Sequence, residues 1–344
     1  MVIRVGLIGY GYWGPNLARN FSESEGTTVA GVSDAREDRL AAAARRYPGI
    51  RTFHSALDLI RDPGIDAVAI ATPVNSHFDL AWQALSEGKH VLVEKPMTSS
   101  SQEALRLIDL AARKKLVLMV DHTFVYTGAV RKIRDVVRSG EFGELYYYDS
   151  VRVNLGLFQY DVNVLWDLAV HDISIMNYVL PQEPVAVSAT GATHVPGGNE
   201  DIAYMTFMFE SNLIAHCHVN WLAPVKVRRT LIGGSRKMIV YDDVEPSEKV
   251  KVYDKGITVA NTSETIYKML VSYRSGDVWV PHLDQTEALR TEVAEFRRCV
   301  ETGATPVTDA FAGLSTVRLL EAATHSIRNR GAVVDVPASG KAAA

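Results

Sequence analysis

The segment GLIGYGYWGPNLARNF, residues 6–21, decides the fold of the first part of this chain. Its glycines have the spacing Gly9-x-Gly11-x-x-Gly14, directly after an apolar run and directly before a helical pattern with Pro15 in its first turn. Glycines at these places allow a tight turn, a close approach of the backbone to a phosphate, and close helix–strand packing. The start of a helix adds free N–H groups and the positive end of the helix dipole. The segment therefore predicts a strand–turn–helix unit that binds the pyrophosphate of a dinucleotide.

The acidic residue Asp34 ends the next apolar run, 20 positions after Gly14. A carboxylate there accepts hydrogen bonds from the adenosine ribose and repels a 2′-phosphate. One charge pair at 4 Å is worth about 1–4 kcal/mol, which changes binding roughly tenfold to several-hundredfold. NAD is therefore the expected cofactor, while Ser33 and Arg36 could hold a phosphate and keep NADP open. A glycine-rich turn without a ligand is the weaker alternative, because strand, helix and acidic residue all agree.

Strand and helix patterns alternate through the first 122 residues. Short runs rich in Val and Ile are typical of strands that are buried on both faces of a parallel sheet. Strands that alternate with amphipathic helical segments predict βαβ units. The apolar runs are residues 3–9, 28–33, 66–72, 90–93 and 116–120, and two clear helical patterns are residues 78–89 and 101–115.

The pattern changes after residue 143, where apolar and polar residues alternate between turn signals. Such alternation predicts a half-exposed, mostly antiparallel sheet. We therefore expect an α/β protein with a Rossmann dinucleotide-binding domain over residues 1–123. An α+β domain with an open, mostly antiparallel sheet is expected over residues 124–338, for substrate binding and oligomerisation. The strand patterns are residues 144–153, 185–194, 202–210, 213–221, 227–234 and 237–243, and the helical ones 166–180, 285–303 and 310–331.

The composition is that of an ordinary globular protein, with 47% hydrophobic and 22% charged residues. The net charge of −4 and the scattered basic residues argue against a nucleic acid or an anionic membrane as partner. No apolar run is long enough for a transmembrane helix, and the N-terminus lacks the features of a signal peptide. Cys217 and Cys299 stand in unrelated contexts, which argues against a disulfide framework. We expect a cytoplasmic protein.

Lys95 directly follows an apolar run in the segment VEKPM, residues 93–97. Pro96 favours an extended backbone at Lys95, which then stands at the carboxyl end of a parallel strand. Open α/β sheets bind ligands at this edge, on the side where the glycine turn also lies. Lys95 is therefore a candidate active-site residue, although a solvated loop lysine fits its position equally well.

Asp167 and His171 lie four positions apart in the helical segment WDLAVHD, so that they share one helix face. A carboxylate can orient an imidazole ring, and such a pair suits acid–base catalysis near neutral pH. A surface pair that only stabilises the helix is the alternative. His216 and His218 of AHCHVNW lie on one strand face, and no cluster of Cys and His at zinc-like spacing follows them. We therefore predict no metal site.

These motifs together resemble the glucose–fructose oxidoreductase/inositol dehydrogenase (Gfo/Idh/MocA) family. The glycine spacing is common to many dehydrogenases, whereas Glu-Lys-Pro followed later by Asp-x-x-x-His is far more specific. YWGPN and LWDLAVHDISIM are most similar to members that act on nucleotide-linked sugars. Many sugar-alcohol members have glycines where this chain has VNVLWD, which makes an inositol-type substrate less secure. The likeness covers nearly the whole chain and rests on GYGYWGPNLARNF, ATPVNSH, VEKPM, WDLAVHDIS and DAFAGLSTVRLLEAATHSI.

The resemblance implies roles for the matching residues. Lys95, before a bond to Pro96 that could be cis, would hydrogen-bond the reacting hydroxyl and stabilise developing alkoxide character. His171 would take or give the proton, and Asp167 would orient His171 or hold a neighbouring hydroxyl. Glu94 would position Lys95 or the nicotinamide. Further cofactor contacts are expected from Gly9, Tyr10, Gly11, Tyr12, Trp13, Gly14, Asp34, Thr72, Pro73, Asn75, His77 and Lys95.

Substrate contacts are harder to predict from the sequence. Lys95, Asp167 and His171 are expected to touch the substrate, and Arg152 and Asn154 of SVRVNLGLF are further candidates. A plain strand surface is an equally good interpretation of the last two residues.

The expected activity is hydride transfer between NAD(P) and a secondary hydroxyl or ketone of a sugar, with a nucleotide-linked sugar favoured. Alternatives are an inositol or free-sugar dehydrogenase, an NAD-dependent glycosidase, and a non-catalytic NAD-binding sensor. The resemblance implies a homodimer or homotetramer packed through the open face of the second sheet. Tyr204, Phe207 and Phe209 are expected on that exposed face.

Overall fold

The structure, a computed structural model, describes residues 2–155, 161–254, 256–259, 271–274 and 276–338. The described chain forms two compact units. The sequence analysis placed the domain boundary after residue 123, and unit 1 in the structure ends its first segment at Tyr126. Unit 1 also contains residues 286–318, which the sequence analysis assigned to the second domain. Unit 2 consists of residues 127–285 and 319–338.

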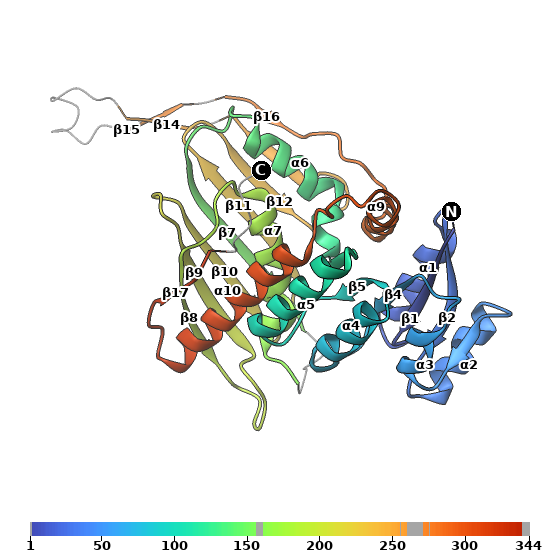
Figure 1. The fold of residues 1–344 in the computed structure, drawn as a ribbon. Coiled ribbons are helices and arrows are strands. Elements are labelled where there is room, and N and C mark those ends of the chain that lie inside the picture. The colour runs from blue at the N-terminus through green and yellow to red at the C-terminus, as the bar shows by residue number, and fades with distance from the viewer. Residues whose placement is uncertain (1, 156–160, 255, 260–270, 275, 339–344) are drawn as a thin grey trace. The chain divides into compact units, whose positions relative to one another are not determined.

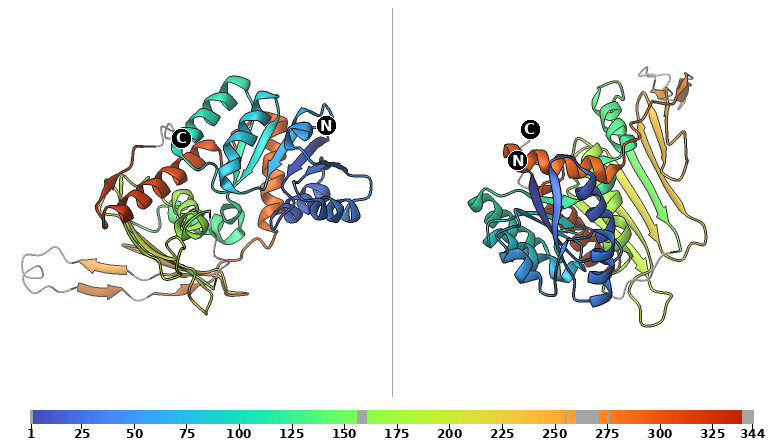
Figure 2. Two further views of the ribbon diagram at one scale, coloured as in Figure 1. Left: turned by 90° about the horizontal axis from the view of Figure 1, so that it is seen from below. Right: turned by 90° about the vertical axis from the view of Figure 1, so that its right-hand side faces the viewer.

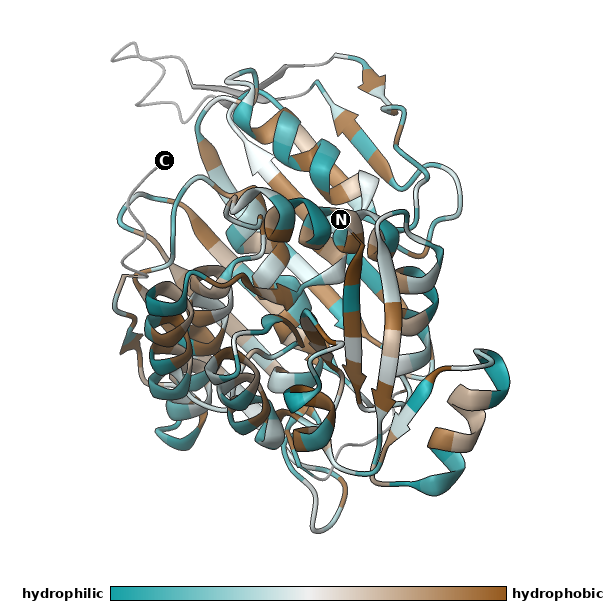
Figure 3. Ribbon diagram, turned by 45° about the vertical axis from the view of Figure 1, so that its right-hand side comes forward, coloured by the Kyte–Doolittle hydropathy of each residue, from teal (hydrophilic) through white to brown (hydrophobic). Residues whose placement is uncertain are grey.

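Unit 1 contains a six-stranded sheet in which every pair of neighbours is parallel. This order, which reverses direction between β1 and β4, is that of a Rossmann fold and confirms the predicted domain. Its strands carry mainly apolar side chains, as the colouring of Figure 3 shows. In sheet order they are β3 (Arg51–Phe53), β2 (Thr27–Ser33), β1 (Ile3–Ile8), β4 (Ala67–Ile70), β5 (His90–Glu94) and β6 (Leu118–Asp121).

Helices cover both faces of this parallel sheet (Figure 2). Right-handed crossovers place α1 and α2 on one face, and α3, α4 and α5 on the other. Phe296 of α9 packs edge-on against Phe21 of α1, which explains why this late helix belongs to unit 1. The helices are α1 (Gly14–Glu23), α2 (Glu37–Arg46), α3 (Ala56–Arg61), α4 (His77–Ser86), α5 (Ser101–Lys114), α9 (Ala288–Thr302) and the short turns η1 (Val74–Ser76) and η2 (Thr123–Tyr126).

Unit 2 contains a nine-stranded sheet that is antiparallel except between β7 and β10, which confirms the predicted open, mostly antiparallel sheet (Figure 1). In sheet order its strands are β16 (Val278–Trp279), β13 (Val250–Tyr253), β12 (Met238–Asp242), β11 (Val227–Gly234), β7 (Leu145–Val153), β10 (Ile214–Asn220), β9 (Ile202–Met208), β8 (Ala186–Ala192) and β17 (Val334–Asp335). The unit also has α6 (Gly128–Arg138), the π-helical turn η3 (Leu165–Ala169), α7 (Val170–Val179) and a separate hairpin of β14 (Gly256–Val259) and β15 (Val271–Arg274). Helix α10 (Ala310–Arg328) begins in unit 1 and ends in unit 2.

The expected exposure of three aromatic residues in unit 2 is partly wrong. Tyr204 is 42% exposed, but Phe207 and Phe209 are 0% and 7% exposed and belong to the core. Successive side chains of a strand point to opposite faces, so Tyr204 cannot share a face with Phe207 or Phe209. The ring of Tyr204 stacks instead on His218 of the neighbouring strand, with the ring centroids 4.4 Å apart.

Among the described residues, no helix is both long and apolar enough to cross a membrane.

Candidate functional site

The glycine turn of unit 1 has the shape that a dinucleotide requires. Gly9 has a φ of +93°, and a Cβ atom on it would lie 2.5 Å from the carbonyl oxygen of Ala71. A Cβ atom on Gly14 would lie 2.2 Å from the carbonyl oxygen of Gly9. A Cβ atom on Gly11, in contrast, would meet no atom within 4 Å. Two glycines are thus required by the turn itself, and the third keeps open the space in front of the helix start, where a pyrophosphate would be held.

Asp34 fixes the beginning of this turn. Its Oδ2 accepts the backbone N–H of Tyr10 at 2.7 Å, and its Oδ1 accepts the backbone N–H of Arg36 at 2.9 Å. The guanidinium of Arg36 forms an ion pair with Asp38 at 2.8 Å, and Ser33 is buried. Both side chains that could have held a 2′-phosphate are therefore engaged or covered, and the carboxylate of Asp34 remains at the strand end.

We expect NAD to bind more tightly than NADP, roughly tenfold to several-hundredfold, because Asp34 repels a 2′-phosphate. Calorimetric titration of both cofactors measures the ratio of the two dissociation constants. Asp34→Ser should bring the two dissociation constants closer together. It should also weaken the binding of both cofactors, because the N–H of Tyr10 loses its acceptor. Asp38→Ser is the matched control, since it leaves the ribose acceptor in place and should leave NAD affinity unchanged. Tighter binding of NADP by the unmodified protein would contradict the prediction and make Ser33 and Arg36 phosphate ligands.

The predicted segment at residues 71–77 and the turn at Lys95 are joined by a buried histidine. His77 is almost completely buried, and its Nε2 lies 2.7 Å from the carbonyl oxygen of Thr72. Its Nδ1 lies 2.8 Å from the carbonyl oxygen of Pro96, which follows Lys95 through a cis peptide bond. Burial lowers the pKa of His77 and favours a neutral ring. The structure thus brings the ends of β4 and β5 together, with Pro73 and Asn75 exposed at this edge.

Lys95 is half-buried directly after β5, and Glu94 before it is turned into the protein. The Oε2 of Glu94 accepts the backbone N–H of Lys95 at 3.1 Å. The Oε1 of Glu94 is shielded from solvent, although the residue as a whole is only partly buried. Burial, followed by the charge of Asp121, raises the pKa of Glu94 well above its usual range. Glu94 therefore holds the peptide of Lys95 and adds little negative charge beside it at neutral pH.

In unit 2, Asp167 and His171 lie on either side of a change in helix type. Asp167 stands in the π-helical turn Leu165–Ala169, and His171 is the second residue of α7. The Oδ2 of Asp167 accepts the indole N–H of Trp221 at 3.0 Å, and this tryptophan is 1% exposed. The carboxylate is thus fixed by a buried side chain at the end of β10. π-Helical turns occur frequently at functional sites.

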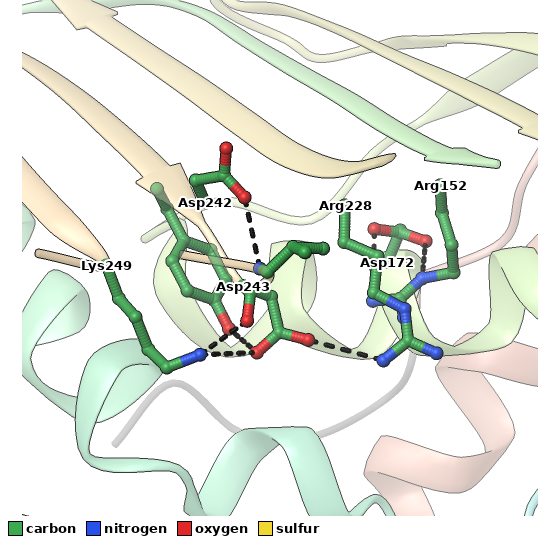
Figure 4. Close-up of polar contacts among 8 residues, drawn as sticks. Arg152, Asp172, Arg228, Asp242, Asp243 and Lys249 are labelled. Carbon is green, nitrogen blue, oxygen red and sulfur yellow. Dashed lines mark hydrogen bonds and ion pairs between the residues drawn. The ribbon is translucent and has the colours of Figure 1, made fainter. Parts of the chain in front are cut away.

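Arg152, a predicted substrate contact, lies under α7 in a buried ion pair. It is 3% exposed, and its Nε donates to the Oδ2 of Asp172 at 2.6 Å (Figure 4). Burial opposes the charge of Arg152, but the Asp172 carboxylate outweighs this and raises its pKa. Asn154 is half-buried and its backbone N–H donates to the carbonyl oxygen of Asn220 at 3.1 Å. Contacts of Arg152 and Asn154 with a substrate stay predictions.

A second charged group lies beside this pair (Figure 4). Asp243 accepts from Arg228 at 3.3 Å and lies 3.7 Å from the ammonium of Lys249. Burial would raise the pKa of Asp243, but Lys249 and then Arg228 outweigh this effect and hold its pKa below the usual range. The hydroxyl of Tyr241 also donates to Asp243 at 3.1 Å. The carboxylate is thus fully engaged by neighbours within unit 2.

Sequence reasoning missed two residues that hold predicted site residues in place. Trp221 fixes Asp167, as described above, and Asp121 accepts the indole N–H of Trp13 at 2.8 Å. No motif marks either residue. Only their positions could have indicated them. Asp121 ends β6, the neighbour of the strand that precedes Lys95, and Trp221 directly follows β10. Among the described residues, no group of three His, Cys, Asp or Glu side chains could hold a metal ion.

Comparison with known proteins identifies the family of both units. The description "Oxidoreductase family, NAD-binding Rossmann fold" (Gfo/Idh/MocA) matches residues 3–122, and "GFO/IDH/MocA C-terminal domain" matches residues 130–240. The chain is 24% identical over 349 residues to myo-inositol 2-dehydrogenase of Thermotoga maritima, covering 96% of this chain and 98% of that protein. It is 33% identical over 196 residues to UDP-N-acetylglucosamine 3-dehydrogenase of Acidithiobacillus ferrooxidans, covering 56% of this chain and 59% of that protein.

The fold is also that of solved dehydrogenases. Levoglucosan dehydrogenase in complex with NADH superposes on this chain with a TM-score of 0.82 at 20% sequence identity. The match covers 98% of this chain and 100% of that chain. At this identity the likeness shows the fold alone. Together with the glycine turn, Asp34 and the two matching family descriptions, it confirms the predicted NAD-binding Rossmann domain. The chain therefore belongs to the Gfo/Idh/MocA family of oxidoreductases and uses NAD as its cofactor.

Proposed function

We propose that this oxidoreductase transfers a hydride between NAD and a secondary hydroxyl or ketone of a nucleotide-linked sugar. The observation that carries the proposal is the 33% identity to an enzyme named UDP-N-acetylglucosamine 3-dehydrogenase. The segment before Asp167 supports it, because VNVLW has apolar residues and a tryptophan where many sugar-alcohol dehydrogenases of the family have glycines. In the structure the last two residues of this segment, Leu165 and Trp166, begin the π-helical turn in which Asp167 is held by Trp221.

The proposed chemistry divides proton and hydride between different partners. When bound, NAD accepts the hydride from the carbon that carries the reacting hydroxyl. His171 takes the hydroxyl proton, and Asp167, fixed by Trp221, orients His171 or a neighbouring hydroxyl. The ammonium of Lys95 stabilises the negative charge that develops on the oxygen. Glu94 suits this role of Lys95, because its buried carboxyl accepts the backbone N–H of that lysine.

An inositol-type dehydrogenase is the second candidate. It is favoured by the 24% identity to a myo-inositol 2-dehydrogenase, which extends over 98% of that protein. An NAD-dependent glycosidase would use the same residues but would release the sugar without net reduction of the cofactor. A non-catalytic sensor would bind NAD and show no turnover with any sugar.

A substrate screen separates these functions. Nucleotide sugars, inositols and free hexoses are each mixed with the protein and NAD or NADP, and the absorbance of the reduced nicotinamide is followed. We expect turnover with a UDP-linked sugar and NAD. Turnover with inositols and none with nucleotide sugars would contradict the proposal, and release of free sugar without a change in absorbance would establish the glycosidase. The Lys95→Ala variant serves as a background control in every reaction.

We further propose that the open face of the nine-stranded sheet forms a contact between two copies of the chain. Apolar side chains that are at least partly exposed lie on this face of neighbouring strands, and large apolar patches seldom stay bare on a monomer. The register places Ile214 beside Met208, and Leu231 beside Val240. Residues that form this open face, here named the sheet patch, are Tyr204, Met208, Ile214, Leu231 and Val240.

Light scattering at micromolar concentration is expected to give a mass of at least twice the 37.8 kDa of one chain. Ile214→Lys together with Leu231→Lys should shift the mass toward the monomer, because two buried ammonium groups oppose association. Leu105→Lys on α5 is the matched control, since this exposed leucine lies outside the sheet patch. A monomeric mass for the unmodified chain would contradict this proposal.

A further inference from the structure

Three carboxyl groups from distant parts of the sequence meet inside unit 1, beside the glycine turn. Glu94 ends β5, Asp121 ends β6, and these two residues are register partners in the parallel sheet. Glu292 comes from α9. Asp121 is 1% exposed, Glu292 is 0% exposed, and the Oε1 of Glu94 is shielded from solvent. We name these residues the carboxyl cluster.

Asp121 is the member of the cluster that receives hydrogen bonds from other side chains. Its Oδ2 accepts the indole N–H of Trp13 at 2.8 Å, and its Oδ1 accepts the hydroxyl of Thr123. Trp13 belongs to the glycine turn, and its carbonyl oxygen accepts the N–H of Asn16 at 2.9 Å, at the start of α1. Asp121 therefore ties the point where the dinucleotide helix begins to the end of β6.

Glu94 and Glu292 both lie close enough to Asp121 for its charge to act on them. In the described part of the chain, no N–H or O–H group donates to the Oε1 of Glu94 or to either carboxyl oxygen of Glu292. Burial, and next the charge of Asp121, raises the pKa of both glutamic acids well above the usual range. A protonated carboxyl is itself a donor, so both residues can hydrogen-bond to Asp121.

The remaining groups around the cluster do not supply a compensating charge next to Glu292. Burial lowers the pKa of His122 to about 4, so this ring is neutral at neutral pH. Burial and then the nearness of Glu292 raise the pKa of Tyr126, whose hydroxyl lies 3.0 Å from that of Thr308. Lys95 acts on Glu94 and partly opposes the rise in its pKa. The titratable groups that face the cluster are thus Lys95 directly after β5, His122 after β6 and Tyr126 on η2, and Glu295 on α9 acts on Tyr126.

We propose that Glu94, Asp121 and Glu292 form a proton-sharing carboxyl cluster in which Asp121 is a positioning residue that holds Trp13, and with it the glycine turn, in the shape that binds NAD. Glu94 and Glu292 carry the shared protons, and Asp121 accepts hydrogen bonds from the indole of Trp13 and the hydroxyl of Thr123. The inference depends on NAD binding and is independent of the sugar that the enzyme oxidises.

The first test measures whether Asp121 acts through Trp13. Asp121→Asn and Trp13→Phe are each expected to weaken NAD binding about 10- to 100-fold, the range for loss of a hydrogen bond to a charged group. The double variant should bind NAD no more weakly than the single variant with the larger loss, because both changes remove the same hydrogen bond. The readout is the dissociation constant of NAD by calorimetry. Losses that add up in the double variant would overturn the proposal.

Asp309→Asn is the matched control for this test. Asp309 is a buried aspartate of the same unit, and its Oδ1 caps the start of α10 by accepting the N–H of Ala312 at 2.9 Å. This variant should lower the melting temperature and change the dissociation constant of NAD by less than about twofold. If Asp309→Asn weakens the binding of NAD as much as Asp121→Asn does, the loss reflects general stability and the proposal fails.

The second test follows the protons and needs no cofactor. A carboxyl whose pKa is raised in the folded state costs stability as the pH rises above its unfolded pKa, since the unfolded chain releases the proton first. Glu292→Gln keeps a donor toward Asp121 but cannot ionise. Its melting temperature should therefore exceed that of the unmodified protein by an amount that grows from about pH 5 to about pH 8. Parallel melting curves over this range would overturn the proposal, even if Asp121→Asn fails to fold.

The same variant predicts a change in the pH profile of NAD binding. In the unmodified protein, ionisation of Glu94 and Glu292 at alkaline pH places further negative charge beside Asp121 and disturbs the turn, so NAD affinity should fall. In Glu292→Gln the fall should be smaller, and Glu292→Ala should not reproduce this because it removes the donor as well. Identical pH profiles for the unmodified protein and Glu292→Gln would overturn the proton-sharing cluster.

Discussion

Lys95→Ala and His171→Ala are each expected to lose about 10²- to 10⁴-fold in kcat, the usual cost of a missing acid–base group. Lys95 stands after the carboxyl end of β5, where a sheet of this kind presents its ligand-binding residues. His171 is half-buried near the start of α7, one residue before the buried aspartate that anchors this helix. Steady-state kinetics on the substrate found by the screen give kcat, and calorimetry gives the affinity for NAD.

Two comparisons distinguish chemistry from folding in these variants. Lys95→Arg should also be poor, because a planar guanidinium cannot replace a compact ammonium. Lys114→Ala and His325→Ala, which change exposed residues, are the matched controls and should keep near-normal turnover. The loss for His171→Ala should shrink at high pH if the residue acts as a general base, since hydroxide then competes better. Near-normal turnover of Lys95→Ala or His171→Ala, with an unchanged melting temperature, would return that residue to a structural role.

Features set by short-range sequence patterns could be predicted, because spacing along one element fixes them. The three glycines lie within one turn, and the structure explains each of them by a steric contact or by open space. The position of Lys95 followed from the apolar run before it and from the proline after it. The acidic residue at the end of β2 was likewise found by its distance from the glycines, and its contact with Tyr10 shows why the turn needs it.

Contacts between distant parts of the chain could not be predicted in this way. Trp13 and Asp121 are 108 positions apart, and Glu292 reaches the same cluster from a helix that the sequence analysis placed in the other domain. The error for Phe207 and Phe209 has a different cause. The prediction put these two residues on one face with Tyr204, although the alternation of side chains along a strand places Tyr204 on the opposite face. The π-helical turn at Asp167 also has no simple sequence signal.

The buried pair of Arg152 and Asp172 shows how such distant contacts support the site. Strand β7 and helix α7 are joined at this point, one residue after His171. The guanidinium also donates from Nη2 to the Oδ1 of Asp172 at 3.5 Å, so both carboxylate oxygens of Asp172 face Arg152. A buried pair adds little net stability compared with apolar residues, but loss of one partner leaves an uncompensated charge inside the protein.

Asp172→Ala is therefore expected to lower the free energy of unfolding by about 3–5 kcal/mol, measured by urea denaturation. Asp109→Ala, which breaks an exposed pair with Arg113, is the matched control and should cost at most about 1 kcal/mol. The double variant Arg152→Met with Asp172→Leu should recover most of the loss, because apolar residues of similar volume replace the two charges. A loss for Asp172→Ala no larger than that of the exposed control would contradict the buried pair. A double variant that is stable but has a reduced kcat would give Arg152 and Asp172 a role in the reaction beyond stability.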